Sequence, residues 1–143
     1  LFYMGTSRES AGIIEKQTAN ITNSNLDALE ATHQLKAQSV KMKEAILMGE
    51  IDQLGKIMHD GWQFKKMMAN GISNSEIDAI YETAMQNGAT GGKISGAGGG
   101  GYFFFYCPLV SRTRLIESLV PFGITVQQYH FTKEGLYTYT VNR

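Results

Sequence analysis

The sequence predicts one α+β domain over residues 1–143, with an antiparallel sheet of the ferredoxin-like split βαβ type and inserted helices. Three observations support this fold class. A strand-like stretch opens the chain, four helix-length segments follow, and a strand-rich part with one short helix begins after residue 88. The order β-α-α-α-α-β-β-α-β-β is that of a split βαβ unit with two inserted helices and an extra edge strand.

The first strand is expected over Leu1–Met4, an apolar stretch rich in strand-forming residues. Thr6 and Glu9 have the spacing of a capping box, in which each side chain pairs with the other residue's backbone amide. A helix should therefore begin there and continue to about Ala19.

A long second helix is expected to begin after a cap at Ser24 or Asn25 and to reach Met48, where Gly49 breaks the pattern. His33 falls on its apolar stripe, so core packing is the expected role of this histidine. The stripe consists of Leu26, Leu29, Ala37, Val40 and Leu47.

A third helix is expected over roughly Ile51–Met68 and ends before an Asn-Gly pair. Ser73 and Glu76 form a second capping-box pattern, which predicts a fourth helix that closes at Gly88. Glycine is favoured just past a helix end because it adopts the left-handed conformation without strain.

Beyond Gly88 the periodicity changes to that of strands. The letters GGKIS predict a short strand, GAGGGG a turn, and YFFFYC at residues 102–107 a strand buried on both faces. Because a strand that is apolar on both faces needs cover on both, residues 102–106 should lie in the interior of the sheet.

After Pro108 a helix is expected at about Ser111–Val120. Two strands should follow, near Ile124–Phe131 and Leu136–Val141. Gly135 lies between them and can take a positive φ, which favours a hairpin.

Charge and cysteine content exclude several classes of function. Thirteen acidic residues balance thirteen basic ones, without a block of like charge, so we expect no nucleic-acid partner and no membrane surface. The single cysteine, Cys107, cannot form an internal disulfide, and a reducing cytoplasm is the expected location. The opening letters LFYMG contain no initiator methionine at position 1, which suggests a piece of a longer protein.

Seven of the eleven residues from 91 to 101 are glycine, and such a cluster needs a physical reason because glycine is costly to order. Gly96, Gly98 and Gly101 spell G-x-G-x-x-G, but a dinucleotide fingerprint requires a helix next, and a strand follows here. A Walker loop fails because Ile94 follows Lys93 where Ser or Thr should bind Mg²⁺. A protein-kinase glycine loop fails because its later motifs are missing.

Two interpretations of the glycine turn stay open. Consecutive backbone amides could form an anion-binding nest, or let another loop approach closely. Alternatively, the glycines only solve a steric problem in a tight hairpin. Lys93 and Ser95 beside the turn favour phosphate.

Three stretches resemble a known family. GATGGKISGAGGGGYFFF is similar to the third conserved motif of the GHMP kinases, small-molecule kinases named for galactose, homoserine, mevalonate and phosphomevalonate. GISNSEIDAIYETAMQNGA resembles the segment before that motif in sugar kinases, and YMGTSRESAGIIE resembles a Y-T-G-x-S-R-x-A pattern, with Met4 in place of the usual Thr. Taken together, the three stretches are most similar to kinases of D-glycero-D-manno-heptose 7-phosphate, and next to fucokinase-type sugar kinases.

The resemblance implies an ATP-dependent kinase that phosphorylates an alcohol group of a sugar or sugar phosphate, with its active site between two domains. ATP and Mg²⁺ would be bound by the full-length enzyme. The ATP-binding loop and the acidic catalytic residue belong to an N-terminal partner domain in this family, so this chain would be the C-terminal domain, inactive alone. The phosphate-loop region would comprise Lys93, Ser95, Gly96, Ala97, Gly98, Gly99, Gly100 and Gly101.

Arg8, His59 and Ser73 are the candidate substrate residues. Arg8 could bind a substrate phosphate or contact the other domain, by analogy with the family. His59 lies near Trp62 and two lysines, where a polar surface cluster is the alternative to a substrate contact. Ser73 is first a helix cap and second a ligand.

The histidines and the cysteine lack metal-ligand spacing, so no metal site is expected. No carboxylate stands out as a catalytic base. A non-catalytic ligand-binding or regulatory module of the same fold remains the alternative function.

Overall fold

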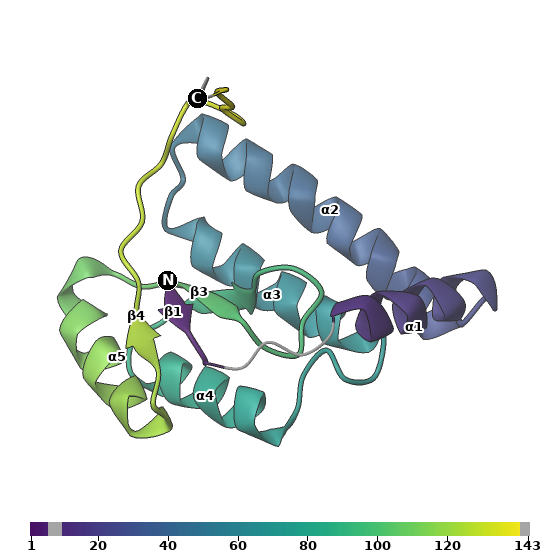
Figure 1. Ribbon diagram of the computed structural model, residues 1–143, viewed down its shortest axis with the longest axis horizontal. Coiled ribbons are helices and arrows are strands. Elements are labelled where there is room, and N and C mark those ends of the chain that lie inside the picture. The colour runs from purple at the N-terminus through teal and green to yellow at the C-terminus, as the bar shows by residue number, and fades with distance from the viewer. Residues whose placement is uncertain (6–9, 141–143) are drawn as a thin grey trace.

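The computed structural model describes residues 1–5 and 10–140 and shows a four-stranded sheet within them (Figure 1). The strand order is β2-β3-β1-β4, and every neighbouring pair is antiparallel. The strands are β1 (Phe2–Tyr3), β2 (Gly91–Ile94), β3 (Tyr102–Tyr106) and β4 (Thr125–Val126). The fold class is therefore α+β as predicted, and β3 lies inside the sheet between β2 and β1.

Five α-helices surround this sheet within the described residues. In Figure 1, α2 packs on the outer side of α3 and α5 lies beside α4. α3 and α4 also contact each other, since the rings of Trp62 and Tyr81 lie 6.2 Å apart. No helix in the described part of the chain is long and apolar enough to cross a membrane. The helices are α1 (Ser10–Thr22), α2 (Leu26–Met48), α3 (Gln53–Met67), α4 (Ser75–Gln86) and α5 (Arg112–Leu119), with 3-10 turns at Leu109–Ser111 and Val120–Phe122.

Helix caps explain where α2 begins and ends. Asn25, rather than Ser24, caps α2, because its side-chain oxygen accepts a 2.9 Å hydrogen bond from the amide of Ala28. Gly49 closes the helix in the left-handed conformation, with φ +74°. The capping box predicted for α1 at Thr6 and Glu9 lies outside the described residues.

The predicted cap of α4 was wrong by one residue. Asn74 is in an extended conformation, and its side chain accepts a 2.9 Å hydrogen bond from the amide of Ile77. Ser73 precedes the cap, and its hydroxyl donates to the carboxylate of Asp78 instead. Serine and asparagine both cap helices well, so residue type alone does not decide between neighbouring candidates.

The core is centred on aromatic side chains between the sheet and the helices. Phe103 of β3 is fully buried against Trp62 of α3, with ring centroids 5.9 Å apart, and against Tyr81 of α4 at 6.1 Å. Leu115 and Leu119 of α5 belong to the same core cluster. Because both flanking helices supply rings to one strand, the position of α3 and α4 over the sheet is fixed by this cluster.

α3 approaches β2 with no side chain between them at one point. A Cβ atom on Gly91 would overlap the carbonyl oxygen of Gly55 and lie 2.9 Å from the amide nitrogen of His59. A Cβ atom on Gly55 would overlap the side chain of Thr90. Glycine is therefore required at both positions for helix and strand to touch.

The prediction that residues 102–107 are buried on both faces was wrong. Phe103 is fully buried, but Tyr102 is 40% exposed and Phe104 and Tyr106 are only half-buried. Side chains alternate between the two faces of a strand, and the helices cover the face that carries Phe103.

The C-terminal hairpin is also absent from the described residues. Only Thr125–Val126 of the predicted strand at 124–131 pairs, with β1, and the amide of Gln127 makes one further bond to the carbonyl of Leu1. Residues 127–140 contain no strand. Leu136 and Tyr137 are 95% and 81% exposed, so the alternating pattern there has no described strand to pair with.

The predicted apolar stripe of α2 does not face the core. Leu26 and Leu47 are 80% and 77% exposed, and His33 is exposed as well. The buried residues are instead Ala28, Ala31, Gln38 and Ala45. Small side chains let α2 approach α3 closely, and this close contact overrides the larger residues' preference for burial.

Candidate functional site

The glycine loop, defined as residues Ser95–Gly101, joins β2 to β3 as predicted. Its first amide continues the strand ladder, since Ser95 N donates to the carbonyl of Tyr102 at 2.8 Å. The loop's other end is held by the amide of Met4, which donates to the carbonyl of Gly101 at 3.0 Å. Positive φ angles occur at Gly96, Gly98, Gly99, Gly100 and Gly101. Residues with side chains rarely adopt such angles, which explains the density of glycine.

One side of the glycine loop is packed against the α3–α4 connection. The amide of Gly99 donates a 2.8 Å hydrogen bond to the carbonyl of Ile72. A Cβ atom on Gly98 would lie 2.8 Å from that same oxygen. Part of the glycine content is therefore structural, because another loop approaches the backbone here.

Most amides of the glycine loop have no described protein acceptor. Within the described residues, the amides of Gly96, Ala97, Gly98, Gly100 and Gly101 donate to no protein acceptor. Gly98 and Gly100 are nevertheless buried. Successive amides with positive φ angles are the backbone of an anion-binding nest, and buried amides normally find an acceptor.

Two lysines lie beside the glycine loop. Lys93 of β2 is exposed as a residue, but its ammonium donates a 2.8 Å hydrogen bond to the carbonyl of Ile94, and burial lowers its pKa. Lys65 in the last turn of α3 is half-buried; burial first, and then the positive charge of Lys93, lower its pKa. The two ammonium groups therefore share one electrostatic environment.

Gln17 of α1 links Lys65 to the glycine loop. The ammonium of Lys65 donates a 2.9 Å hydrogen bond to Gln17 Oε1. Gln17 Nε2 in turn donates to the carbonyl oxygen of Ala97 at 3.3 Å. Side chains from α1 and α3 and the backbone of the glycine loop therefore meet at one place.

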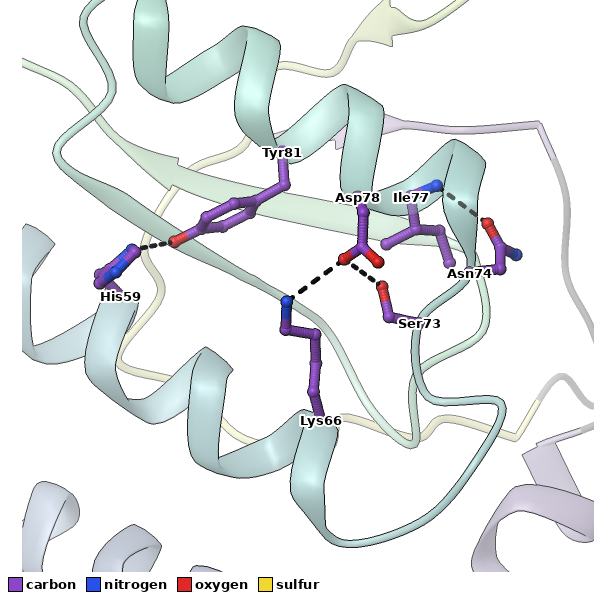
Figure 2. Close-up of polar contacts among 7 residues, drawn as sticks. All are labelled: His59, Lys66, Ser73, Asn74, Ile77, Asp78 and Tyr81. Carbon is purple, nitrogen blue, oxygen red and sulfur yellow. Dashed lines mark hydrogen bonds and ion pairs between the residues drawn. The ribbon is translucent and has the colours of Figure 1, made fainter.

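A separate groove runs between α3 and α4, with a volume of about 430 Å³. Figure 2 shows that side chains from the two helices reach across toward one another here. The groove is lined by His59, Gln63, Lys66, Asp78, Tyr81, Glu82, Met85 and Gln86.

The side chain of His59 takes part in the contact between α3 and α4. Its Nδ1 atom lies 2.9 Å from the hydroxyl of Tyr81, and that tyrosine is only 5% exposed (Figure 2). Burial is the main cause that raises the pKa of Tyr81 to about 12; a hydrogen bond with the backbone of Gly92 lowers it, and the charge of Asp60 raises it. The hydroxyl of Tyr81 therefore stays neutral at physiological pH, where it can donate or accept a hydrogen bond but carries no charge.

Ser73 and Lys66 share one acceptor across the same groove. The Ser73 hydroxyl donates to Asp78 Oδ1 at 2.8 Å, and the Lys66 ammonium lies 3.3 Å from the same oxygen (Figure 2). The structure thus gives Ser73 and His59 protein partners within the α3–α4 contact. Within the described residues, neither side chain has a hydrogen bond to the glycine loop.

The third candidate substrate residue, Arg8, lies outside the described residues. Sequence reasoning missed Gln17 entirely and placed Lys65 only in a surface cluster with His59. No motif marks either residue, since a Gln and a Lys on helices are ordinary surface residues. In the described part of the chain, no three His, Cys, Asp or Glu side chains come together as metal ligands.

Comparison with known proteins agrees with this architecture. The family model of the GHMP kinase C-terminal region matches residues 42–121. A D-glycero-alpha-D-manno-heptose 7-phosphate kinase from Campylobacter jejuni subsp. jejuni serotype O:2 is 35% identical over 141 residues, which are 99% of this chain and 41% of that protein. The chain thus spans less than half the length of this relative.

Two solved structures share the fold at low sequence identity. An L. major mevalonate kinase in complex with R-mevalonate has a TM-score of 0.74 at 19% identity, covering 83% of this chain and 36% of its own. The Lin0012 protein from Listeria innocua has a TM-score of 0.76 at 18% identity, covering 91% and 39%. Because the family model covers more than half of the sequence, the chain belongs to the GHMP kinase family, and residues 42–121 carry its C-terminal domain.

Proposed function

We propose that this chain is the C-terminal domain of an ATP-dependent kinase that phosphorylates a sugar or sugar phosphate similar to heptose 7-phosphate. The observation that carries the proposal is the glycine loop, five of whose amides have no acceptor among the described residues, beside the ammonium groups of Lys65 and Lys93. The 35% identity to a heptose 7-phosphate kinase supports this substrate class.

Phosphoryl transfer explains why such a loop is useful. Its catalysis consists mainly of positioning the reactants and neutralising charge on phosphate oxygens. Backbone amides and ammonium groups do both, and amides fixed by the bond between Gly99 and Ile72 need no rearrangement. ATP, when bound, supplies the phosphoryl group. In the full-length enzyme, we propose, the glycine loop forms one wall of the phosphate site.

The described residues fit phosphate but not Mg²⁺. Amide and ammonium donors match phosphate oxygens, whereas Mg²⁺ requires carboxylate or other oxygen ligands. The described residues contain no cluster of three potential metal ligands. We therefore place the Mg²⁺ ligands, the nucleotide-binding loop and the catalytic base in an N-terminal partner domain, and we expect the 143-residue chain alone to be inactive.

The test measures ADP formation by the full-length protein with ATP, Mg²⁺ and a panel of acceptors: heptose 7-phosphate, fucose and galactose. We expect turnover with the heptose phosphate and none by the isolated chain. No ATP turnover with any acceptor, in a protein that still binds sugar phosphates, would favour the non-catalytic binding module instead. Acceptor-dependent turnover by the isolated chain would contradict the division of the site between two domains.

A variant of the glycine loop tests its role directly. Gly96 has φ +87°, and a Cβ atom there would meet nothing within 4 Å. Gly96→Ala therefore disturbs the loop's conformation without a clash, and we expect kcat/KM to fall at least tenfold, equivalent to about 1.4 kcal/mol. Gly123→Ala, also at positive φ and without neighbours within 4 Å, is the matched control and should leave kcat/KM unchanged. Equal activity of both variants would show that the loop only closes a hairpin.

A further inference from the structure

We propose that Lys65, Lys93 and Gln17 form a binding site for a phosphate dianion beside the glycine loop, a site that the sequence motifs do not mark. The site rests on the proposed function only for the identity of the phosphorylated ligand. The binding of phosphate itself follows from the charge and geometry of the chain.

The charges around Lys65 and Lys93 are not balanced by the described residues. Within the described residues, ion pairs form between Lys56 and Asp60 and between Lys66 and Asp78, but no carboxylate oxygen lies within 4.0 Å of Lys65 or Lys93. Two unneutralised ammonium groups, each partly withdrawn from water, destabilise a folded protein. A phosphate dianion would neutralise both charges at once.

Lys65 and Lys93 also keep hydrogen-bond donors that no described residue accepts. An ammonium group has three N–H donors and no acceptor. Lys65 uses one donor on Gln17, and Lys93 uses one on the carbonyl of Ile94. Each lysine therefore keeps two donors, and the nearby amides of Gly96 and Ala97 add two more.

Both lysines are held in place by neighbouring residues. Lys65 is tied through Gln17 to the carbonyl of Ala97, which fixes its ammonium group at the glycine loop. Lys93 lies on a strand whose register with β3 pairs it with Phe104. A site on rigid elements pays less entropy on binding than one formed by free side chains.

The α3–α4 groove does not offer the same chemistry. It also contains a lysine, Lys66, but Asp78 neutralises that charge and Glu82 adds another negative one. A phosphate would be repelled there. The preference for phosphate is therefore specific to the glycine-loop side of α3.

The phosphate could come from either of two ligands. A sugar phosphate carries a phosphomonoester, and ATP ends in a terminal phosphate; both present dianionic oxygens at neutral pH. The shared chemistry is the phosphate dianion, and kinetics can distinguish its source.

The direct test is calorimetric titration of the full-length protein with inorganic phosphate and with heptose 7-phosphate, at constant ionic strength because these contacts are screened by salt. Lys65→Met removes the charge but keeps the length of the side chain. We expect the Kd for phosphate to rise at least tenfold in this variant and in Lys93→Met. Lys56→Met, on the same helix but exposed and paired with Asp60, is the control and should stay within twofold of the wild type.

Thermal unfolding of each variant shows whether it folds. An unchanged Kd in a folded Lys65→Met protein would overturn the proposal, and so would the absence of saturable binding of either phosphate to the wild type. A non-kinase would still lose phosphate binding in Lys65→Met, so the failure of the proposed function is distinguishable from the failure of this site.

Steady-state kinetics then identify the ligand. A KM for the sugar phosphate that rises at least tenfold, with the KM for ATP unchanged, assigns the site to the acceptor; the reverse pattern assigns it to the nucleotide. A lower kcat with both KM values unchanged would show that these lysines do not bind phosphate in the ground state, and would overturn the proposal.

Discussion

The amide of Gly99 donates a 2.8 Å hydrogen bond to the carbonyl of Ile72, which joins the glycine loop to the connection between α3 and α4. At the neighbouring position, a Cβ atom on Gly98 would lie within 2.9 Å of two backbone or side-chain atoms of Ile72 besides the carbonyl oxygen. The loop is therefore both a packing element and a source of free amides. Its glycines should respond differently to substitution.

Gly98→Ala should destabilise the protein more than Gly96→Ala. Both residues have positive φ, which costs an alanine about 1–2 kcal/mol. Only the alanine at position 98 also clashes with Ile72, which adds about 1–3 kcal/mol for overpacking. Urea unfolding of the two variants measures the difference in the free energy of unfolding. Equal losses would mean that the α3–α4 connection moves aside at little cost.

The buried hydroxyl of Tyr81 should ionise only at a pH well above the ordinary pKa of tyrosine. Its pKa is raised to about 12, mainly by burial, from an ordinary value of 10.0. Between these values the folded protein holds a proton that the unfolded chain has lost, so stability falls as the pH rises from 10 to 12. A spectroscopic titration of tyrosinate absorbance should show one late step, absent from Tyr81→Phe. A wild-type titration without that step would contradict this prediction.

Replacing Lys65 should stabilise the protein. Its pKa is lowered below the ordinary value of 10.5, mainly by burial, so the folded state binds this proton more weakly than the unfolded chain does. Burial of the charged ammonium lowers the free energy of unfolding by its full amount at every pH below the folded-state pKa. Above that pKa, the free energy of unfolding rises with pH until about 10.5, the ordinary pKa that applies to the unfolded chain.

Urea unfolding at neutral pH measures this cost directly. Lys65→Met should raise the free energy of unfolding by up to about 1 kcal/mol, since the side chain is only half-buried. Lys66→Met is the control: it removes the partner of Asp78 and should lower stability slightly or leave it unchanged. A Lys65→Met variant less stable than the wild type would indicate that the bond to Gln17 outweighs the burial of charge.

The cap of α4 can be tested with two adjacent variants. Asn74→Ala removes the acceptor of the Ile77 amide and should cost about 1 kcal/mol of stability. Ser73→Ala removes only a hydroxyl bonded to the partly exposed Asp78, and should cost less. Thermal unfolding of both variants decides the order, and the reverse order would restore Ser73 as the cap.

Local signals in the sequence were sufficient for much of the fold. Helix ends at Asn25 and Gly49, and the strand–turn–strand around the glycine loop, follow from capping and glycine chemistry within a few residues. The hairpin expected over residues 124–141 does not form in the described residues: only Thr125–Val126 pair, and their partner is the distant β1 rather than the neighbouring segment. Strand propensity alone does not supply a partner.

Only part of the candidate site could be predicted from the sequence, because its residues come from segments that are distant along the chain. The glycines form one contiguous motif, so they could be found directly. Gln17 and Lys65 are 48 residues apart and meet only through the tertiary packing of α1 and α3. The candidate substrate residues His59 and Ser73 form hydrogen bonds with Tyr81 and Asp78 of α4.

The contact between Gly55 and Gly91 has a mechanical consequence for the far end of α3. Lys65 lies ten residues beyond Gly55, which is a lever arm of about 15 Å along the helix axis. A side chain that wedged helix and strand apart and tilted α3 by about 10° would swing Lys65 by about 2.5 Å, roughly the length of a hydrogen bond. The contact between Gly55 of α3 and Gly91 of β2 thereby helps to determine the position of Lys65 at the other end of the helix.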